Sequence, residues 1–193
     1  MNQNRFWNWF RQNADVITRD YNDDALIKDL DSEVSLSWPA LSWEIGPDPS
    51  GGWYFALSPN LKREMLKAAR AAIGDAPQTP RWKFYATRQR KSWNGRFEVS
   101  TSEGRLEIYS SNWRYVLLRY PDGECEIVLI GNEADLLGDT ERWQAAAIVV
   151  EGMLGEACIL DNNLSFALSS TPEPQFVGKE KPVQDLPRAF GLE

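Results

Sequence analysis

Hydrophobic residues near the start of the chain recur every three or four positions, which is the spacing of one helix face. The apolar stripe lies between residues 4 and 21 and consists of Phe6, Phe10, Ala14 and Ile17, with Trp7 beside it. The pattern predicts an amphipathic helix whose stripe is buried against the main sheet. Trp9 lies about 200° around the helix from Trp7, so we expect it to be more exposed.

The same spacing predicts three more helices. One covers residues 22–38, with the Asn22–Asp24 cluster supplying its cap, and stops before Pro39, which cannot continue a helix. Another covers residues 58–74, with Ser58 as its cap. The last covers residues 139–155, and its apolar stripe is expected to consist of Trp143, Ala147, Val150 and Leu154.

Alternating polar and apolar residues predict a sheet. The expected strands cover residues 41–45, 53–57, 82–87, 96–99, 105–109, 114–120, 124–130 and 164–168. The turn-forming residues 46–52 join the first two into a β-hairpin, and short turns join most of the others, which favours antiparallel pairing. This order of elements is typical of a single α+β domain over residues 1–170, with helices packed on a predominantly antiparallel sheet. Prolines scattered among charges predict an irregular, proline-rich tail over residues 171–193.

The composition excludes several kinds of chemistry. The chain contains no histidine, which removes the commonest general base and metal ligand. Its net charge of −7 opposes binding to nucleic acid or to an anionic membrane. Cys125 and Cys158 make no disulfide framework. The longest apolar run, residues 145–150, is far shorter than the roughly 20 residues of a membrane helix, and residues 1–10 lack a signal-peptide pattern. We therefore expect a cytoplasmic protein without a membrane segment.

Charge is distributed unevenly along the chain. Residues 81–120 carry a balance of +6 and residues 121–171 a balance of −9. The densest basic stretch is Arg88–Lys91, followed by Trp93. One interpretation is a clamp for phosphate or for an acidic protein surface, because arginine offers bidentate donors and tryptophan a stacking face. The other is a solvated strand end whose charges pair with Asp and Glu side chains of the neighbouring helix.

The nine tryptophans are numerous for this length and divide into two groups. Apolar stripes favour core positions for Trp7, Trp43, Trp82 and Trp143. Polar neighbours favour exposure for Trp9, Trp93 and Trp113. Exposed indoles would mark a contact surface.

No motif for a nucleophile, a phosphate-binding loop or a metal site is present in the sequence, so it predicts no catalytic residue, metal ligand or cofactor. Paired carboxylates are better explained as a helix cap, a strand face and a loop. The candidate binding residues are therefore those of the basic stretch and two glutamates expected to join it, namely Arg88, Arg90, Lys91, Trp93, Glu44 and Glu156.

Four segments stand in a familiar order: Phe6–Phe10, Leu41–Gly46, Ala76–Phe84 followed by Arg88, and Glu151–Glu156. Together they resemble an uncharacterised bacterial family of small cytoplasmic proteins with an N-terminal aromatic helix, a hairpin and a tryptophan strand after a proline pair. The resemblance covers residues 5–170. It implies no activity.

Three functions compete at this point. The first is a non-catalytic binding or accessory protein, which would bind another protein and neutralise it as bacterial immunity proteins do. The second is an enzyme without histidine that acts on an anionic substrate through a carboxylate and arginine pocket. It requires Glu44, Glu151 or Glu156 to converge with Arg88 or Arg90. The third is a nucleic-acid binder using residues 81–120, which the net charge opposes. A homodimer through an exposed strand edge also fits the sequence.

Overall fold

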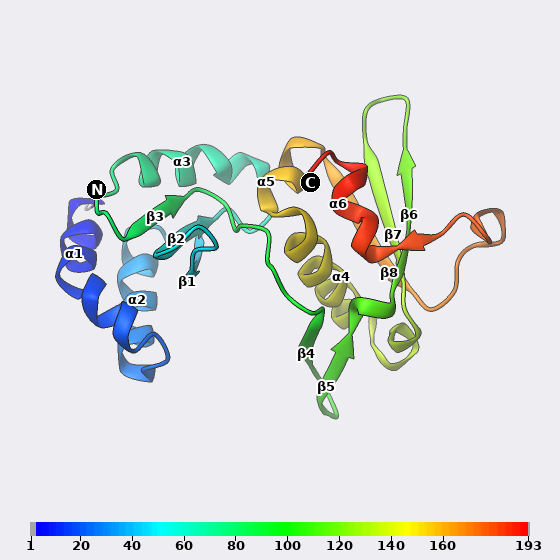
Figure 1. The fold of residues 1–193 in the computed structure, drawn as a ribbon, viewed down its shortest axis with the longest axis horizontal. Helices are drawn as coiled ribbons and strands as arrows, with labels where there is room; N and C mark the ends of the chain where they lie inside the picture. The colour runs from blue at the N-terminus through cyan, green and yellow to red at the C-terminus, as the bar shows by residue number, and fades with distance from the viewer. Residues whose placement is uncertain (1–2, 193) are drawn as a thin grey trace. The chain divides into compact units, whose positions relative to one another are not determined.

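The structure is a computed structural model that describes residues 3–192, so the ends of the expected domain and tail, residues 1–2 and 193, lie outside it (Figure 1). It confirms the α+β class and the mostly antiparallel pairing. The strands form three sheets rather than one. The chain divides into two compact units, Met1–Arg88 and Gln89–Glu193.

The first unit contains three helices and a three-stranded sheet. Its elements are α1 (Gln3–Arg19), α2 (Asp24–Ser37), β1 (Ser42–Pro47), β2 (Trp53–Ser58), α3 (Leu66–Gly74) and β3 (Trp82–Tyr85). β1 and β2 form the expected antiparallel hairpin. β3 lies parallel to β2, because the connection through α3 returns the chain to the end of the sheet where β2 begins. At the start of α2 the Asp23 side chain accepts a hydrogen bond from the Leu26 amide, as its cap position requires.

The N-terminal stripe is buried as the sequence predicts. Phe6, Phe10 and Ile17 are completely inaccessible, and Trp7 is 1% exposed. The rings of Phe6, Trp7 and Phe10 contact aromatic side chains on β2 and β3, which are Phe55, Trp82 and Phe84. Helix α1 therefore covers one face of this sheet, and aromatic packing forms the core of the unit.

The third helix is shorter than predicted. It begins at Leu66, after a 3₁₀ turn at Arg63–Met65, and not at Ser58. Asn60 and Leu61 have φ angles of 56° and 59°, a left-handed backbone that cannot belong to a right-handed helix. The Ser58 hydroxyl instead accepts a hydrogen bond from the Asn60 amide within this turn.

The second unit contains a hairpin and a four-stranded sheet. The hairpin is β4 (Arg96–Thr101) with β5 (Gly104–Tyr109), and the sheet has the order β8-β7-β6-β9. Its strands are β6 (Arg114–Arg119), β7 (Cys125–Ile130), β8 (Leu164–Ser169) and β9 (Lys181–Pro182). β6 and β7 are antiparallel, whereas β8 runs parallel to β7 because helices α4 (Asp139–Leu154) and α5 (Glu156–Asp161) connect them.

The buried face of α4 differs from the predicted stripe. Trp143 is 55% exposed and stacks on Phe166, so its assignment to the core is wrong. The buried positions are Ala145, Ala146, Val149, Val150, Gly152 and Leu154. Gly152 allows a close approach, because a Cβ atom there would lie 2.9 Å from the Trp93 ring.

The expected exposure of Trp113 is also wrong. Its side chain is 2% exposed, and its ring lies so close to Gly131 that a Cβ atom there would clash with it. The indole Nε1 donates a hydrogen bond to Glu133 Oε2 at 2.9 Å. A polar partner for the nitrogen and a glycine beside the ring make a buried position possible among polar sequence neighbours.

The tail is more regular than predicted. It contains β9, which pairs with β6, and the short helix α6 (Leu186–Ala189). Val183 and Leu186 are buried, and this burial of apolar side chains holds the segment against its own unit. Among residues 3–192 no helix has both the length and the apolar composition needed to span a membrane.

Candidate functional site

Two of the predicted binding residues meet in the first unit. Arg88 Nε lies 4.0 Å from Glu44 Oε2, and Arg88 Nη2 donates a hydrogen bond to the Ser42 hydroxyl at 2.8 Å. The Tyr54 hydroxyl also donates to Glu44. The strand register places Ser42, Glu44 and Tyr54 on one face of the sheet, opposite the aromatic core.

The same face carries a second polar cluster around Asp48. Its Oδ1 lies 2.8 Å from Lys83 Nζ, and its Oδ2 accepts a hydrogen bond from the Tyr85 hydroxyl at 3.1 Å. The Ser50 amide and hydroxyl donate to the same carboxylate. Asp48 is buried, with all of these donors around it.

The contacts of this polar face fix its protonation states. Hydrogen bonds from Lys83 and then Ser50 hold the pKa of Asp48 far below its usual value. Burial, and then the hydrogen bond to Glu44, raises the pKa of Tyr54 well above its usual value. The hydrogen bond to Asp48 also raises the pKa of Lys83. Each shift moves the pKa of its group further from neutral pH, whereas a general acid or base needs a pKa near the working pH.

Three other predicted residues lie in the second unit, at the C-terminal end of α4. Arg90 Nε donates to the Met153 carbonyl at 2.9 Å, and its guanidinium also donates to the Leu192 carbonyl. The Lys91 amide donates to the Gly152 carbonyl at 2.8 Å, while Trp93 packs on that glycine. A cation and an amide thus bind the last carbonyls of the helix, where both are electrostatically favoured.

Glu156, the remaining predicted residue, is completely buried at the first position of α5. The structure therefore brings Glu44 and Arg88 together in the first unit and holds Arg90, Lys91 and Trp93 against one helix end in the second. Among residues 3–192 no cluster of three or more carboxylate or thiol side chains has the arrangement of a metal site.

The basic segment 81–120 is largely paired within the protein. Lys83, Arg96 and Arg105 form ion pairs with Asp48, Glu107 and Glu98, all of them on strands or in the β1–β2 turn. Arg114 and Arg119 donate to the carbonyls of Glu180 and Ala189 in the tail. Of the two interpretations of this segment, the contacts favour internal pairing, although the partners are not on a neighbouring helix.

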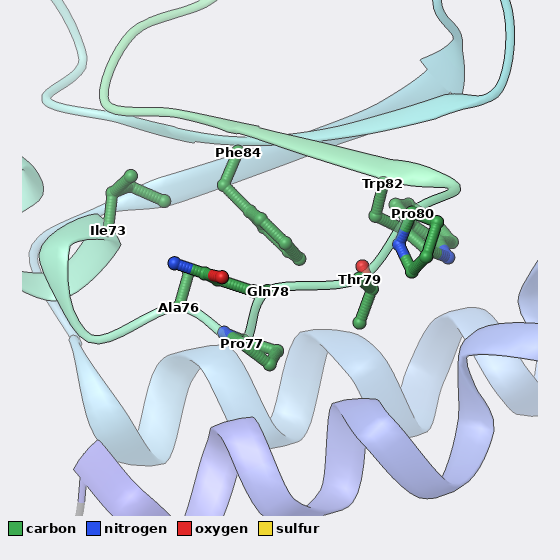
Figure 2. Close-up of a pocket in the computed structure, with 8 residues that line it drawn as sticks. All are labelled: Ile73, Ala76, Pro77, Gln78, Thr79, Pro80, Trp82 and Phe84. Atoms are coloured by element: carbon green, nitrogen blue, oxygen red, sulfur yellow. The ribbon is translucent and has the colours of Figure 1, made fainter.

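A pocket that the sequence did not predict lies between α3 and β3 in the first unit (Figure 2). Its volume is about 620 Å³, within the usual range of ligand sites. It is lined by Ile73, Ala76, Pro77, Gln78, Thr79, Pro80, Trp82 and Phe84. Figure 2 shows the rings of Trp82 and Phe84 projecting from β3 toward the loop that carries the prolines. The floor is therefore apolar and aromatic, with the Gln78 amide and the Thr79 hydroxyl as polar groups.

The Thr79 hydroxyl is the unusual group of this pocket. Its oxygen is buried, yet it has no hydrogen-bond partner among residues 3–192. Nearly all buried polar groups in proteins are hydrogen-bonded, so an exception calls for an explanation. The indole nitrogen of Trp38 shares this property, but Trp38 belongs to the aromatic core and does not line the pocket. The proline pair around Thr79 was the only sequence signal for this loop.

Comparison of the chain with protein-family models, with curated proteins and with solved structures finds no match in any of the three. The resemblance to a bacterial family stays a prediction.

Proposed function

We propose that this protein is a non-catalytic binding protein that recognises another protein, and that the pocket beside β3 holds an apolar side chain of that partner. The observation that carries the proposal is the Thr79 hydroxyl, buried at the pocket and without a partner within residues 3–192. The oxygen has almost no exposed surface in the free protein, so rotation of the Thr79 side chain on binding would bring it to a backbone or side-chain group of the partner, which would complete its hydrogen bond. A buried hydroxyl left unsatisfied costs about 1–3 kcal/mol, which binding would recover.

The shape of the pocket favours a protein over a small molecule. Gln78 and Pro80 are exposed at its border, while Trp82 is buried beneath them. Sites for small molecules enclose most of the ligand surface, whereas this pocket opens to solvent along the α3–β3 loop. An apolar anchor residue in an open pocket with a polar border is typical of protein interfaces.

The polar face of the sheet supports a role without catalysis. Asp48, Lys83 and Tyr54 are held in single protonation states by their partners. These contacts resemble a structural ion-pair network, since each group is moved away from the pKa that proton transfer at neutral pH needs.

A second candidate function is an enzyme that binds an anionic substrate through Arg88 with Glu44 as its acid or base. The approach of these two residues favours it. The hydrogen bonds that Ser42 and Tyr54 form with the pair oppose it, because they occupy the groups a substrate would need. Glu44→Gln would abolish such an activity and would leave partner binding at the pocket unchanged.

A substitution that fills the pocket tests the proposed function. Ala76→Trp places an indole among the lining residues, and Leu36→Trp adds the same group at a position of α2 that is 67% exposed. Tagged wild-type protein and both variants would be used to recover partners from lysate of the source organism, and the partner would then be purified and titrated by calorimetry. We expect wild type and Leu36→Trp to bind it alike, and Ala76→Trp to bind at least about tenfold more weakly. Equal binding by all three proteins would refute the role of the pocket.

Thr79→Val provides a second test that does not alter the shape of the pocket. Valine replaces the hydroxyl by a methyl group, so the free protein should become more stable by about 1 kcal/mol, because the unsatisfied group is removed. Partner affinity should fall, because the hydrogen bond to the partner is lost. A loss of stability in the free variant would show that the hydroxyl is already bonded, and would remove the observation on which the proposal depends.

A further inference from the structure

The outer edge of β6 in the second unit is covered along only part of its length. β9 pairs with Arg114 and Tyr115 and includes no further residue. It is limited to Lys181–Pro182, because the residues before it turn away, with the Lys179 amide donating to the Phe176 carbonyl. The rest of β6, from Val116 to Arg119, therefore has β7 on one side and, within residues 3–192, no paired strand on the other.

The hydrogen-bond alternation of an antiparallel pair identifies the open groups. The Tyr120 amide donates to the Glu124 carbonyl, and these residues continue the register in which Arg119 opposes Cys125. Hydrogen-bonded pairs alternate along such a ladder. The backbone N–H and C=O groups of the even-numbered residues of β6 therefore point toward β7, and those of the odd-numbered residues point toward the outer edge. The outward carbonyl of Trp113, which accepts from the Val183 amide, agrees with this assignment. The backbone groups of Leu117 and Arg119 thus point to the uncovered edge.

A pocket of about 370 Å³ lies along this edge. It is lined by Tyr115, Val116, Leu117, Leu118, Phe176, Lys179, Lys181 and Ala189. Among residues 3–192 no backbone hydrogen bond from the tail or from α6 reaches Leu117. The edge therefore combines outward ladder groups with an apolar recess, which are the two requirements for adding a strand.

The charges around the edge determine which kind of strand could be added to it. Lys179 and Lys181 are exposed at the pocket, and neither forms an ion pair with a carboxylate in the part of the chain that the structure describes. Arg114 and Arg119 stand at the two ends of β6. A second copy pairing through the same edge would bring these cations together, whereas an acidic segment would neutralise them.

We propose that the open edge of β6 binds an extended acidic segment of another protein by strand addition. The Leu117 and Arg119 backbone groups pair with the segment, its apolar side chain enters the recess beside Phe176, and its carboxylates lie near Lys179 and Lys181. This surface lies in the second unit and does not depend on the pocket beside β3.

Hydrogen exchange in the free protein tests the edge itself. The amides of Leu117 and Arg119 should exchange faster than those of Val116 and Leu118, since only the latter are bonded to β7. Equal protection of all four amides would overturn the proposal, and so would a dimer in sedimentation equilibrium that protects Leu117.

Binding is measured with a fluorescent synthetic peptide in which glutamate and valine alternate. We expect it to bind the whole protein, to slow exchange at Leu117 and Arg119, and to bind Lys179→Glu/Lys181→Glu about tenfold more weakly, because both cations are reversed. Lys62→Glu/Lys67→Glu makes the same charge change at exposed residues of the first unit and should bind like wild type.

Two further peptides separate strand addition from simple charge attraction. An N-methylated version of the peptide loses the amide donors that pair with β6, and a lysine–valine version reverses the charge; neither should bind. The proposal would be overturned if the N-methylated peptide bound with equal strength or if the glutamate peptide did not bind. It would also be overturned if the peptide changed hydrogen exchange outside β6 instead of at its edge.

Discussion

Replacement of Trp7 by alanine should remove a large part of the stability of the first unit. The Trp7 ring is 1% exposed and meets Phe6 and Phe84 edge to face, with centroid distances of 4.8 and 5.2 Å. Its Nε1 donates a hydrogen bond to the Ala72 carbonyl at 3.2 Å, which also connects α1 to α3. Removing a buried tryptophan costs about 3–5 kcal/mol in lost transfer energy and cavity formation. The lost hydrogen bond places the expected value near the upper end, at about 4–5 kcal/mol.

Trp9→Ala is the matched control on the same helix. Trp9 is only partly buried, and among residues 3–192 its ring approaches one other aromatic ring, that of Phe6, in a tilted arrangement at 6.2 Å. Full burial of a large apolar side chain is worth about 1.5–3 kcal/mol, so partial burial should cost about 1–2 kcal/mol when it is lost. The two variants remove the same group from one helix, so helix propensity changes equally and their difference measures burial.

Urea unfolding followed by circular dichroism at 222 nm compares the variants, because this signal does not depend on which tryptophan is removed. With an m-value of about 2 kcal/mol per molar, the midpoint should fall by about 2 M for Trp7→Ala and by less than about 1 M for Trp9→Ala. Equal shifts, or a larger shift for Trp9→Ala, would refute the assignment of the buried face.

Two further substitutions test separate features of the structure. Asp48→Asn removes a carboxylate whose pKa is lowered by Lys83. Such a group stabilises the fold fully when the pH is above the pKa of the same side chain in the unfolded chain, about 4, and this stabilisation is lost as the pH falls below that value. The difference in urea midpoint between wild type and this variant should therefore be constant from about pH 8 to 5 and shrink toward pH 3; a constant difference at all pH values would contradict the ion pair. Gly152→Ala should destabilise the protein although alanine favours a helix by about 1 kcal/mol, because the new Cβ would lie 2.9 Å from the Trp93 ring. In a Trp93→Ala background the same change should become stabilising, and a double-mutant cycle of melting curves without this reversal would disprove the contact.

The periodicity of the sequence predicted those elements that depend on interactions between residues close in the chain. The stripe of α1, the capped start of α2 at Asp23 and the hairpin of β1 and β2 all follow from residues close in the chain, and all three are confirmed. The pairing of β3 with β2 was not predictable in this way. Its register joins Trp53 to Trp82, residues separated by the whole of α3, so no local pattern encodes it.

The two wrong tryptophan assignments have one physical cause. Helical spacing placed Trp143 on the apolar stripe of α4, but it lies near the start of that helix and stacks on Phe166 at a position open to solvent. Polar neighbours indicated exposure for Trp113, yet Gly131 leaves room for its ring and Glu133 accepts its N–H. In each case a residue distant in the sequence decides burial.

The candidate binding residues were selected from the sequence mainly by their charge, and in the fold these charges have partners within the protein. Arg88 reaches Glu44, Lys83 reaches Asp48, and Arg90 caps the end of α4. These cations already have hydrogen-bond or ion-pair partners inside the protein, so they leave little free energy for a second partner. A buried hydroxyl without a partner, such as that of Thr79, costs about 1–3 kcal/mol until it is bonded. The capacity to bind is therefore expected where polar groups are unsatisfied, at Thr79 and along the edge at Leu117, and not where charges are dense.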